Sequence, residues 1–421
     1  MKKKVNTIIT KNYTYSSLQT FIIVAVLFPV YFIDFIDSLL LWELICILLY
    51  FIYIVFIYKQ KLVIPKFVIP MLFFCFYLMI NIIIGGSIAY ASAFIINIIL
   101  LICLTNTSTF SNLALSKVLT IYSSIHLLFT IFVATIPESI VNNIFAYILG
   151  SNYWSNWDWR VRQNSNVGIT TQPGNNALYL TILLAILTTQ IITYNKDRKN
   201  MKILYCGCFM LTFIGIALTN KRASLILNIL TVLIIFLLYK KSNSFKYKNI
   251  LKIYCCLLLG IVLFVILFKR TDIFTGIIAK NSLLKDSNDI TNGRLALWHY
   301  ALDKFYEHPV FGVGLKSIYN TLSMDVHNVY LQLLAETGII GFVIFTIALF
   351  AFTIKPLIEF KNLKYTIRYD HLKSIIIGLY LIIYLILYGA ISNIFIDYIP
   401  LTIFMCSVSM ANSYRFMEKR Q

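Results

Sequence analysis

Apolar runs of 16 to 20 residues recur along the whole chain, and they restrict its fold more than any other feature. At about 1.5 Å of rise per residue, each run is long enough as a helix to cross roughly 30 Å of hydrocarbon. The runs are apolar on every side, whereas the strands of a membrane barrel alternate apolar and polar residues. Because 59% of the residues are hydrophobic and 13% charged, the sequence predicts an all-α, polytopic membrane helix bundle.

Twelve such runs are separated by polar intervals, and we predict one span for each, in a single membrane-embedded domain over residues 1–421. The runs are 18–36, 39–57, 67–84, 88–104, 118–136, 177–194, 203–218, 223–239, 253–268, 338–354, 374–388 and 396–412. The first run is long and lacks a small-residue cleavage site, so we interpret it as a retained helix rather than a secretory signal.

The basic residues predict the orientation of the bundle. Of the 36 Lys and Arg residues, 25 fall in intervals on the same side as the N-terminus. Short cytoplasmic loops are enriched in Lys and Arg, so both termini are predicted to lie in the cytoplasm. The formal charge of +19 therefore reflects membrane topology, and we expect no nucleic-acid partner.

Neither a metal site nor a cofactor is expected. The eight cysteines all lie inside apolar runs, with no CxxC pair and no nearby His at ligand spacing. The cytoplasmic loops are short and contain no nucleotide-binding fingerprint, which argues against an ATP-driven pump.

Two external segments are too long to be simple turns: 137–176 and 269–337. Loops of this size in a tight bundle are usually functional. The first contains aromatic residues interleaved with cations: Trp154, Trp157, Trp159, Arg160 and Arg162. This composition suits either stacking on sugars or a position at the lipid headgroups.

Arg222 lies in the stretch Thr219-Asn220-Lys221-Arg222-Ala223-Ser224, at the external end of the seventh span. Its guanidinium offers a planar fork of donors suited to a phosphate or diphosphate. The alternative is an arginine that extends to the lipid headgroups.

In the second external segment, the first predicted helix begins at Gly293. Residues 293–305 predict a helix that presents Arg294 in its first turn, carries Trp298 and stops before Pro309. The following stretch, His308-Pro-Val-Phe-Gly-Val-Gly314, is rich in turn residues, and its glycines permit close backbone approach. We interpret it as a loop that shapes the site.

Residues 325–341 hold the strongest constellation. As a helix, this stretch places Asn328, Gln332 and Glu336 on one stripe, with His327 at its head near the membrane surface. Histidine is well suited to take a proton from an attacking hydroxyl near neutral pH. A surface histidine with a structural role is the alternative.

The order of these motifs resembles the bacterial O-antigen polymerase and ligase family. The resemblance is carried by T-N-K-R-A-S at 219–224, G-R-x-x-x-W at 293–298, H-P-x-x-G-x-G at 308–314 and H-N-x-Y-L-Q-x-L-A-E-x-G-x-x-G at 327–341. Residues 166–176 resemble a further motif, G-x-x-x-x-P-N, from which Gly174, inserted after the proline, departs.

The resemblance implies a GT-C-like bundle that performs inverting glycosyl transfer without metal or nucleotide on the outer face of the bacterial cytoplasmic membrane. The donor would be an undecaprenyl diphosphate-linked glycan, with membrane lipids, a chain-length regulator and a flippase as partners. His327 would be the base, and Arg222 and Arg294 would hold the diphosphate. The residues expected to contact substrate are Arg160, Arg162, Lys221, Trp298, Asn328, Gln332 and Glu336.

Within the family, the short segment between Gly314 and His327 favours a polymerase over a ligase, which must also dock a large acceptor. A flippase or another transporter is an alternative, for which Glu43 and Asp397 are the acidic candidates near membrane depth. A polyprenyl-phosphate sugar transferase is another, for which Asp34 and Asp37 would matter.

Overall fold

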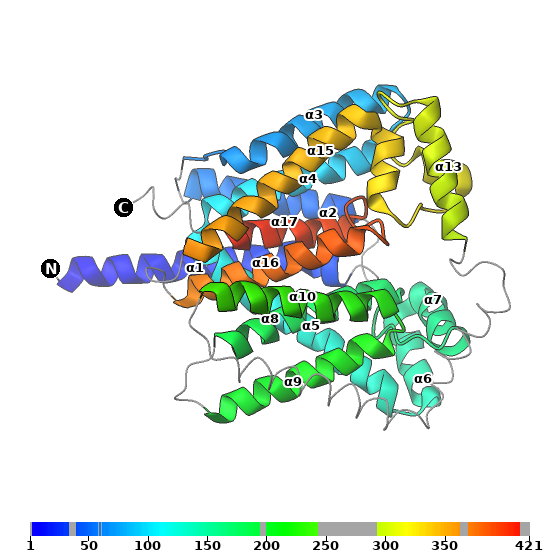
Figure 1. Cartoon of the computed structure of the whole chain (residues 1–421). Coiled ribbons are helices and arrows are strands. Elements are labelled where there is room, and N and C mark those ends of the chain that lie inside the picture. The colour runs from blue at the N-terminus through cyan, green and yellow to red at the C-terminus, as the bar shows by residue number, and fades with distance from the viewer. Residues whose placement is uncertain are drawn as a thin grey trace. The chain divides into compact units, whose positions relative to one another are not determined.

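The regular elements of the computed structural model are all helices, most of them long (Figure 1). The structure describes residues 2–32, 39–57, 59, 61–193, 199–242, 293–362 and 369–412. Within these ranges the prediction of a polytopic, all-helical fold is confirmed.

The chain forms two compact units. Unit 1 comprises Met1–Leu119 and Leu297–Gln421, and unit 2 comprises Thr120–Ala296. The helices of unit 1 are α1 (Lys2–Tyr31), α2 (Leu39–Ile52), η2 (Tyr53–Ile57), η3 (Lys66–Val68), α3 (Ile69–Ile83), α4 (Ile88–Asn106), α14 (Ser317–Leu322), α15 (Val329–Asn362), α16 (Tyr369–Gly389) and α17 (Tyr398–Asn412). The helices of unit 2 are α6 (Glu138–Leu149), η4 (Gly150–Asn152), α7 (Tyr153–Trp157), η5 (Asp158–Arg162), α8 (Pro173–Ile192), α9 (Lys199–Leu218) and α10 (Arg222–Ser242).

Two helices belong to both units along their length. α5 (Ser108–Thr135) begins in unit 1, and α13 (Arg294–Glu307) has its first three residues in unit 2. The prediction of a single membrane domain over the whole chain stays a prediction.

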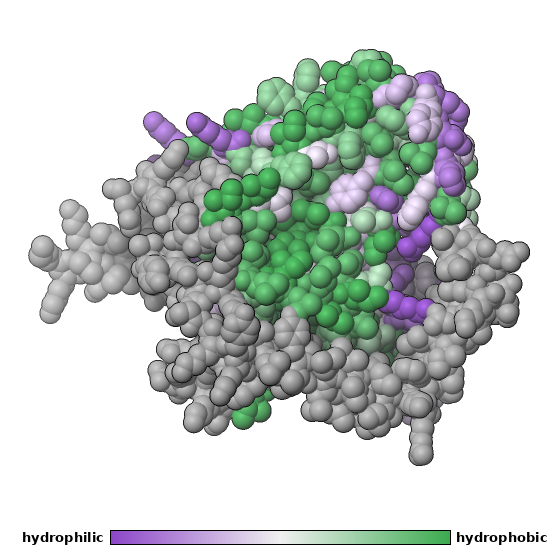
Figure 2. All heavy atoms as spheres, viewed as in Figure 1, coloured by the Kyte–Doolittle hydropathy of each residue, from purple (hydrophilic) through white to green (hydrophobic). Residues whose placement is uncertain are grey.

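Nine helices of the described part are long and apolar enough to cross a membrane. Two shorter apolar helices, Ser17–Tyr31 and Tyr398–Asn412, add to these nine. Together they correspond to eleven of the twelve predicted spans; the remaining one, 253–268, lies outside the described residues. Figure 2 shows the expected surface, with hydrophobic side chains over α3 and α15 and hydrophilic side chains gathered over α13.

Unit 1 is built around aromatic packing between helices that are distant in sequence. α15 packs on α3, α17 packs on α4, and α16 packs on α17. A continuous row of rings joins η3, α15, α17, α3 and α4: Phe67, Phe352, Phe404, Phe395, Phe345, Phe74 and Phe94. Gly378 lets α16 approach α17 closely, because a Cβ there would lie 2.6 Å from the Ser407 carbonyl oxygen.

Helix α15 is broken at Gly338, whose φ of 63° and ψ of −174° are not helical. A break leaves backbone groups of the adjoining turns without helical partners. The loop 309–314 supplies them: Val313 N and Gly314 N donate to the carbonyls of Ala335 and Glu336 (3.1 and 2.9 Å).

The other side of the break is satisfied by the same loop. Ile339 N and Ile340 N donate to the carbonyls of Pro309 and Val310 (2.9 and 3.4 Å). We call loop 309–314 together with the break at Gly338 the interlock. The prediction that the 308–314 glycines permit close backbone approach is confirmed, since a Cβ at Gly312 would meet the Glu336 backbone.

Side chains of α3 hold the interlock in place. The Tyr77 hydroxyl donates to the Phe311 carbonyl (3.1 Å) and the Thr337 carbonyl (2.5 Å). Asn81 Nδ2 donates to the Glu336 carbonyl (3.2 Å), and its Oδ1 accepts from Leu315 N (2.8 Å). One helix therefore fixes both the loop and the broken span.

Replacing Gly338 by alanine is expected to destabilise the protein by about 2–4 kcal/mol. The left-handed backbone costs about 1–2 kcal/mol for a residue with a Cβ, and that Cβ would meet the Val310 carbonyl oxygen. The control is Gly207→Ala on α9, where a Cβ would have nothing within 4 Å. The melting temperature of the detergent-solubilised protein should fall for Gly338→Ala and not for Gly207→Ala. Equal melting temperatures of the two variants would show that the interlock does not contribute to stability.

In unit 2, α8 lies at the centre and packs against α9 and α10. Buried polar contacts fix these helices, such as Asn228 Nδ2 donating to Thr181 Oγ1 (2.8 Å). The predicted external segment 137–176 is largely folded, since it contains α6, η4, α7 and η5 before α8 begins with Pro173 as its first residue. We call residues 138–172 the cap of unit 2.

Candidate functional site

His327 is an exposed side chain on a backbone held tightly on both sides. Its φ of 55° is in the left-handed region, which is uncommon for a residue with a side chain and is often found at functional sites. The preceding carbonyl, of Val326, accepts a hydrogen bond from Trp298 Nε1 (3.1 Å). Val329 N donates to the Ser392 carbonyl (3.1 Å), so the segment is anchored from two other parts of unit 1.

Helix α15 begins at Val329, so the prediction that His327 heads the helix is wrong by two residues. The reason is local, because Asn328 caps the helix. Asn328 Oδ1 accepts from Tyr330 N and Leu331 N, both at 3.2 Å, which satisfies free donors of the first turn. Asn328 was expected to contact substrate; that contact stays a prediction beside this structural role.

The predicted helix at 293–305 is confirmed as α13, which runs from Arg294 to Glu307. It packs through Ala301 on a small apolar cluster with Ile318, Val326 and Ala335. Trp298 is partly buried against this cluster. Its ring and its Nε1 therefore connect α13 to the residue directly before His327.

Lys316 is a site residue that the sequence did not indicate. Its side chain is only 2% exposed, and Nζ lies 2.7 Å from Asp325 Oδ1 and 3.8 Å from Asp397 Oδ1. The rings of Tyr90 and Tyr319 lie 4.8 and 4.7 Å from the same nitrogen, within the range of cation–π attraction. The buried ammonium of Lys316 is thus neutralised, and its partner Asp325 lies two residues before His327.

The charge of Lys316 is secure at neutral pH. Burial lowers the pKa of this ammonium, but the hydrogen bond to Asp325 and the charges of Asp325 and Asp397 outweigh burial and raise the pKa above its ordinary value. Because the folded pKa is raised, this stabilisation is fully present below the ordinary lysine pKa of about 10.4 and is lost only as pH rises beyond it.

Gln332 and Glu336 extend this arrangement into α15. Gln332 Nε2 donates to Asp325 Oδ1 and to Glu336 Oε1, both at 3.1 Å. Glu336 Oε1 also accepts from Ile318 N (3.3 Å). The two side chains share one stripe, as predicted, but both are fully buried, so these contacts make them part of the support for the loop. Their contact with substrate stays a prediction.

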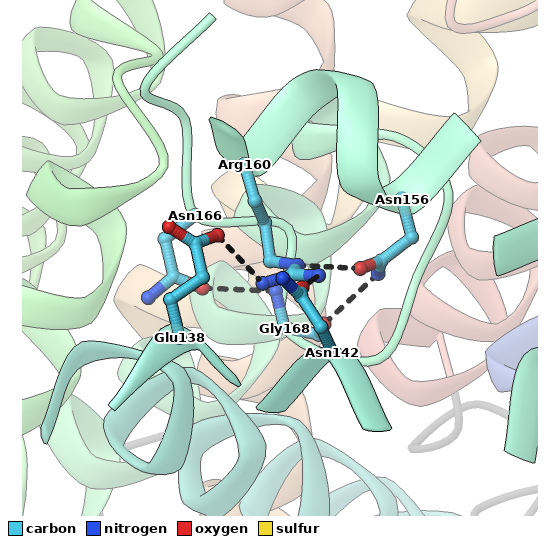
Figure 3. A network of polar contacts seen from close by, with 6 residues as sticks. All are labelled: Glu138, Asn142, Asn156, Arg160, Asn166 and Gly168. Atoms are coloured by element: carbon cyan, nitrogen blue, oxygen red, sulfur yellow. Dashed lines mark hydrogen bonds and ion pairs between the residues drawn. The ribbon is translucent and has the colours of Figure 1, made fainter. Parts of the chain in front are cut away.

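Arg160 forms the polar centre of the cap of unit 2 (Figure 3). Its side chain is 4% exposed, with Nε donating to Asn156 Oδ1 (2.7 Å) and a terminal nitrogen to Asn142 Oδ1 (2.7 Å). The other terminal nitrogen pairs with Glu138 (3.4 Å). Burial lowers the pKa of this guanidinium and the charge of Glu138 opposes that effect.

Asn156 connects Arg160 to the loop before α8. Its Nδ2 donates to the Gly168 carbonyl (3.2 Å), and Asn166 Oδ1 accepts from Gly168 N (2.9 Å) (Figure 3). The same Nδ2 also donates to the Thr170 carbonyl (2.6 Å). Arg160 therefore links α6, η5 and this loop. All three of its nitrogens bond to protein groups. Its predicted contact with substrate stays a prediction.

Arg160→Gln is expected to destabilise the cap by about 2 kcal/mol, because buried acceptors lose charged donors. The matched control is Arg162→Gln, since Arg162 lies on the same π-helix and is 71% exposed. Limited proteolysis of the solubilised protein should cut the cap of Arg160→Gln faster than that of the control. Equal rates would show that the network is not needed for the fold of the cap.

Two further cations of unit 2 lie against tryptophans. The Arg162 guanidinium lies 5.3 Å from the Trp157 ring, and Lys221 Nζ lies 5.5 Å from the Trp159 ring. Both pairs are partly accessible. Stacked aromatic and cationic groups of this kind suit contacts with sugars or with phosphate-bearing headgroups.

The two predicted diphosphate-binding arginines each begin a helix. Arg222 is the first residue of α10 in unit 2, and Arg294 is the first residue of α13. A helix N-terminus has a positive dipole end, which favours an anionic ligand. His327 lies in unit 1, so the meeting of the three groups in one pocket stays a prediction.

The acidic residues of the alternative interpretations have different positions. Glu43 is fully buried in α2, and Asp397 precedes α17 and faces Lys316. Asp34 and Asp37 lie outside the described residues. Among the described residues, no three His, Cys, Asp or Glu side chains form a group that could hold a metal ion.

Residues 207–346 match the family model described as O-antigen ligase. The match covers about a third of the chain and includes Arg222, Arg294, Lys316 and His327. No curated protein matches the chain. The resemblance to the O-antigen polymerase and ligase family is thereby confirmed.

Proposed function

We propose that this protein is an O-antigen or capsular polysaccharide polymerase that acts at the outer face of the bacterial cytoplasmic membrane. It transfers a glycan from undecaprenyl diphosphate to a sugar hydroxyl of a second lipid-linked repeat unit. The observation that carries the proposal is the family match, because its single range contains all three proposed catalytic residues.

In the proposed reaction, His327 takes the proton of the acceptor hydroxyl as its oxygen attacks the anomeric carbon. The bond from that carbon to the diphosphate breaks, and the polyprenyl diphosphate leaves with the bonding electrons. Attack opposite the leaving group inverts the configuration at the anomeric carbon. Arg222 and Arg294 hold the diphosphate and neutralise the charge that builds on it.

The support for His327 as the base is its setting. The side chain is exposed, whereas the backbone around it is anchored by Trp298 and by the Asn328 cap. A base must be held near its productive position to be effective, and rigid support of this kind supplies that. The buried Lys316–Asp325 pair adds a further anchor two residues away.

A ligase is the second candidate, favoured by the description of the matching family. A ligase would use the same donor and the same base, but it would move the finished glycan to a lipid A-core acceptor. The short chain between Gly314 and His327 favours the polymerase, because α14 occupies half of it and little is left to dock a core oligosaccharide.

Reconstitution tests the proposal. The purified full-length chain, placed in liposomes with an undecaprenyl diphosphate-linked oligosaccharide as the sole glycan, is expected to make longer lipid-linked products. Transfer only when a lipid A-core acceptor is added would identify a ligase. A parallel reaction with EDTA examines the need for a metal, and binding of the lipid-linked donor with no glycan transfer in any arm would overturn both candidates.

A further inference from the structure

Helix α6 begins directly where a predicted membrane span ends. The span Ser111–Thr135 in α5 is followed by Ile136 and Pro137, and α6 starts at Glu138. Two connecting residues reach only about 7 Å when extended. The N-terminus of α6 must therefore lie close to the level at which α5 leaves the hydrocarbon.

The surface of α6 has three faces, because successive residues of an α-helix are rotated by about 100°. One face is buried against α5: Val141, Phe145 and Leu149, in a cluster with Phe129 and Phe132. A second face is exposed and apolar: Ile140 (48%), Ile144 (37%), Tyr147 (92%) and Ile148 (37%). A third face is exposed and polar or small: Ser139, Asn143 and Ala146. We call the second the apolar face and the third the polar face.

The presence of both an apolar and a polar exposed face on α6 does not fit a helix that is surrounded by water alone. A helix on a soluble surface exposes polar residues opposite its buried face, whereas α6 exposes a stripe of large apolar side chains beside a polar stripe. No charged residue occurs between Glu138 and Asp158. Tyr147 and Trp154 (69%) are exposed aromatic residues of the cap, and such residues are enriched at membrane interfaces.

We propose that α6 lies in the membrane–water interface, with its apolar face on lipid and its polar face on water. The occupant is the lipid of the bilayer that α5 crosses. The helix has the properties of an interfacial element: one apolar stripe, one polar stripe and a start at the end of a span. This inference is independent of the proposed glycosyl transfer.

The arrangement sets the depth of the whole cap. Arg160 bonds to Asn142 on α6, so η5 is fixed relative to this helix. The Arg162–Trp157 pair then lies at a constant height above the lipid. A lipid-borne ligand would meet this pair near its headgroup.

Nitroxide labels measure the orientation directly. Single cysteines are introduced in turn at Asn143, Ala146, Ile144 and Tyr147 in the full-length chain, with the eight native cysteines replaced by alanine or serine, and the labelled proteins are placed in lipid nanodiscs. Positions 144 and 147 are expected to show a several-fold higher ratio of oxygen to nickel-chelate accessibility than positions 143 and 146.

Two results would overturn the inference. High nickel-chelate accessibility at all four positions would place both faces in water, and low accessibility of both reagents at 144 and 147 would show a protein partner there instead of lipid. Ile140 and Ile148 belong to the same apolar face. Either can be labelled in place of position 144 or 147 if that labelled variant is not monodisperse.

A pair of lysine substitutions gives a second measurement. Ile144→Lys introduces a charge on the apolar face, and Asn143→Lys introduces the same charge one residue away on the polar face. The yield of monodisperse protein from membranes should fall several-fold for Ile144→Lys and stay near that of the parent for Asn143→Lys. Equal yields would argue against lipid contact.

Discussion

A chain carrying His327→Ala is expected to reach the membrane at its normal level and to form no long glycan chains. The side chain is exposed and belongs to neither of the buried clusters, so its removal takes little from the core of unit 1, while the proposed base is lost. Removal of a general base typically lowers a rate by 10²- to 10⁴-fold. The measurement is the length distribution of surface polysaccharide in cells that depend on the variant, with membrane level checked in parallel.

Two further variants separate chemistry from backbone effects. His327→Asn keeps a residue that tolerates a left-handed backbone but removes the proton acceptor, so it should be equally inactive. His308→Ala removes another exposed histidine of unit 1 and should retain normal chain length. Full-length polymer from either His327 variant would remove this residue from the mechanism.

Lys316→Met is expected to destabilise the protein by about 3–5 kcal/mol, because it leaves a carboxylate of a largely buried ion pair without its partner. The Asp325 side chain is 17% exposed, and of the hydrogen bonds within the described residues it would keep the one from Gln332. Thermal melting followed by fluorescence-detected size exclusion measures the effect. Polymer length should fall as well, since the backbone of His327 loses an anchor.

The matched control is Lys304→Met. Lys304 also pairs with an acid at short range, with Glu307 at 2.6 Å, but this pair is accessible to water and screened by it. The double variant Lys316→Met/Asp325→Asn should recover part of the lost stability, because the unpaired charge is gone. Equal melting of the two single variants would show that burial of Lys316 contributes nothing to stability.

Several elements could be predicted from the sequence because local signals define them. The start of α13 follows Gly293, and its end precedes Pro309 by two residues, as the helix-stop signal predicts. The stripe of Gln332 and Glu336 follows from helical spacing alone. The spans were predictable because length and hydropathy suffice to define them.

Other features depend on partners that are distant in sequence. A lysine in a predicted external loop suggests exposure, and the fold brings Asp325, Asp397 and Tyr90 around Lys316. The break at Gly338 was not predicted either, because an isolated glycine within an apolar helical pattern is usually tolerated. Its signal was Gly312, at which a Cβ would meet the backbone of Glu336 and Gly338.

The start of α15 was predicted too early because Asp325, Val326 and His327 continue the helical pattern backwards. The asparagine cap ends that pattern, and an asparagine inside a helical stretch is ambiguous without coordinates. In unit 2, Arg160 was expected to contact substrate, but three acceptors from two helices, α6 and α7, surround it. Sequence spacing alone does not reveal such a set.

The interlock has a consequence for motion near His327. Moving loop 309–314 away from α15 would break four backbone hydrogen bonds together and leave the span with unpaired groups at its break. Loop and span must therefore open as one cooperative unit, with amide protons that exchange at a common slow rate. A hinged lid cannot be made from this loop, so access for a bulky lipid-borne molecule has to come from elements that carry fewer shared bonds.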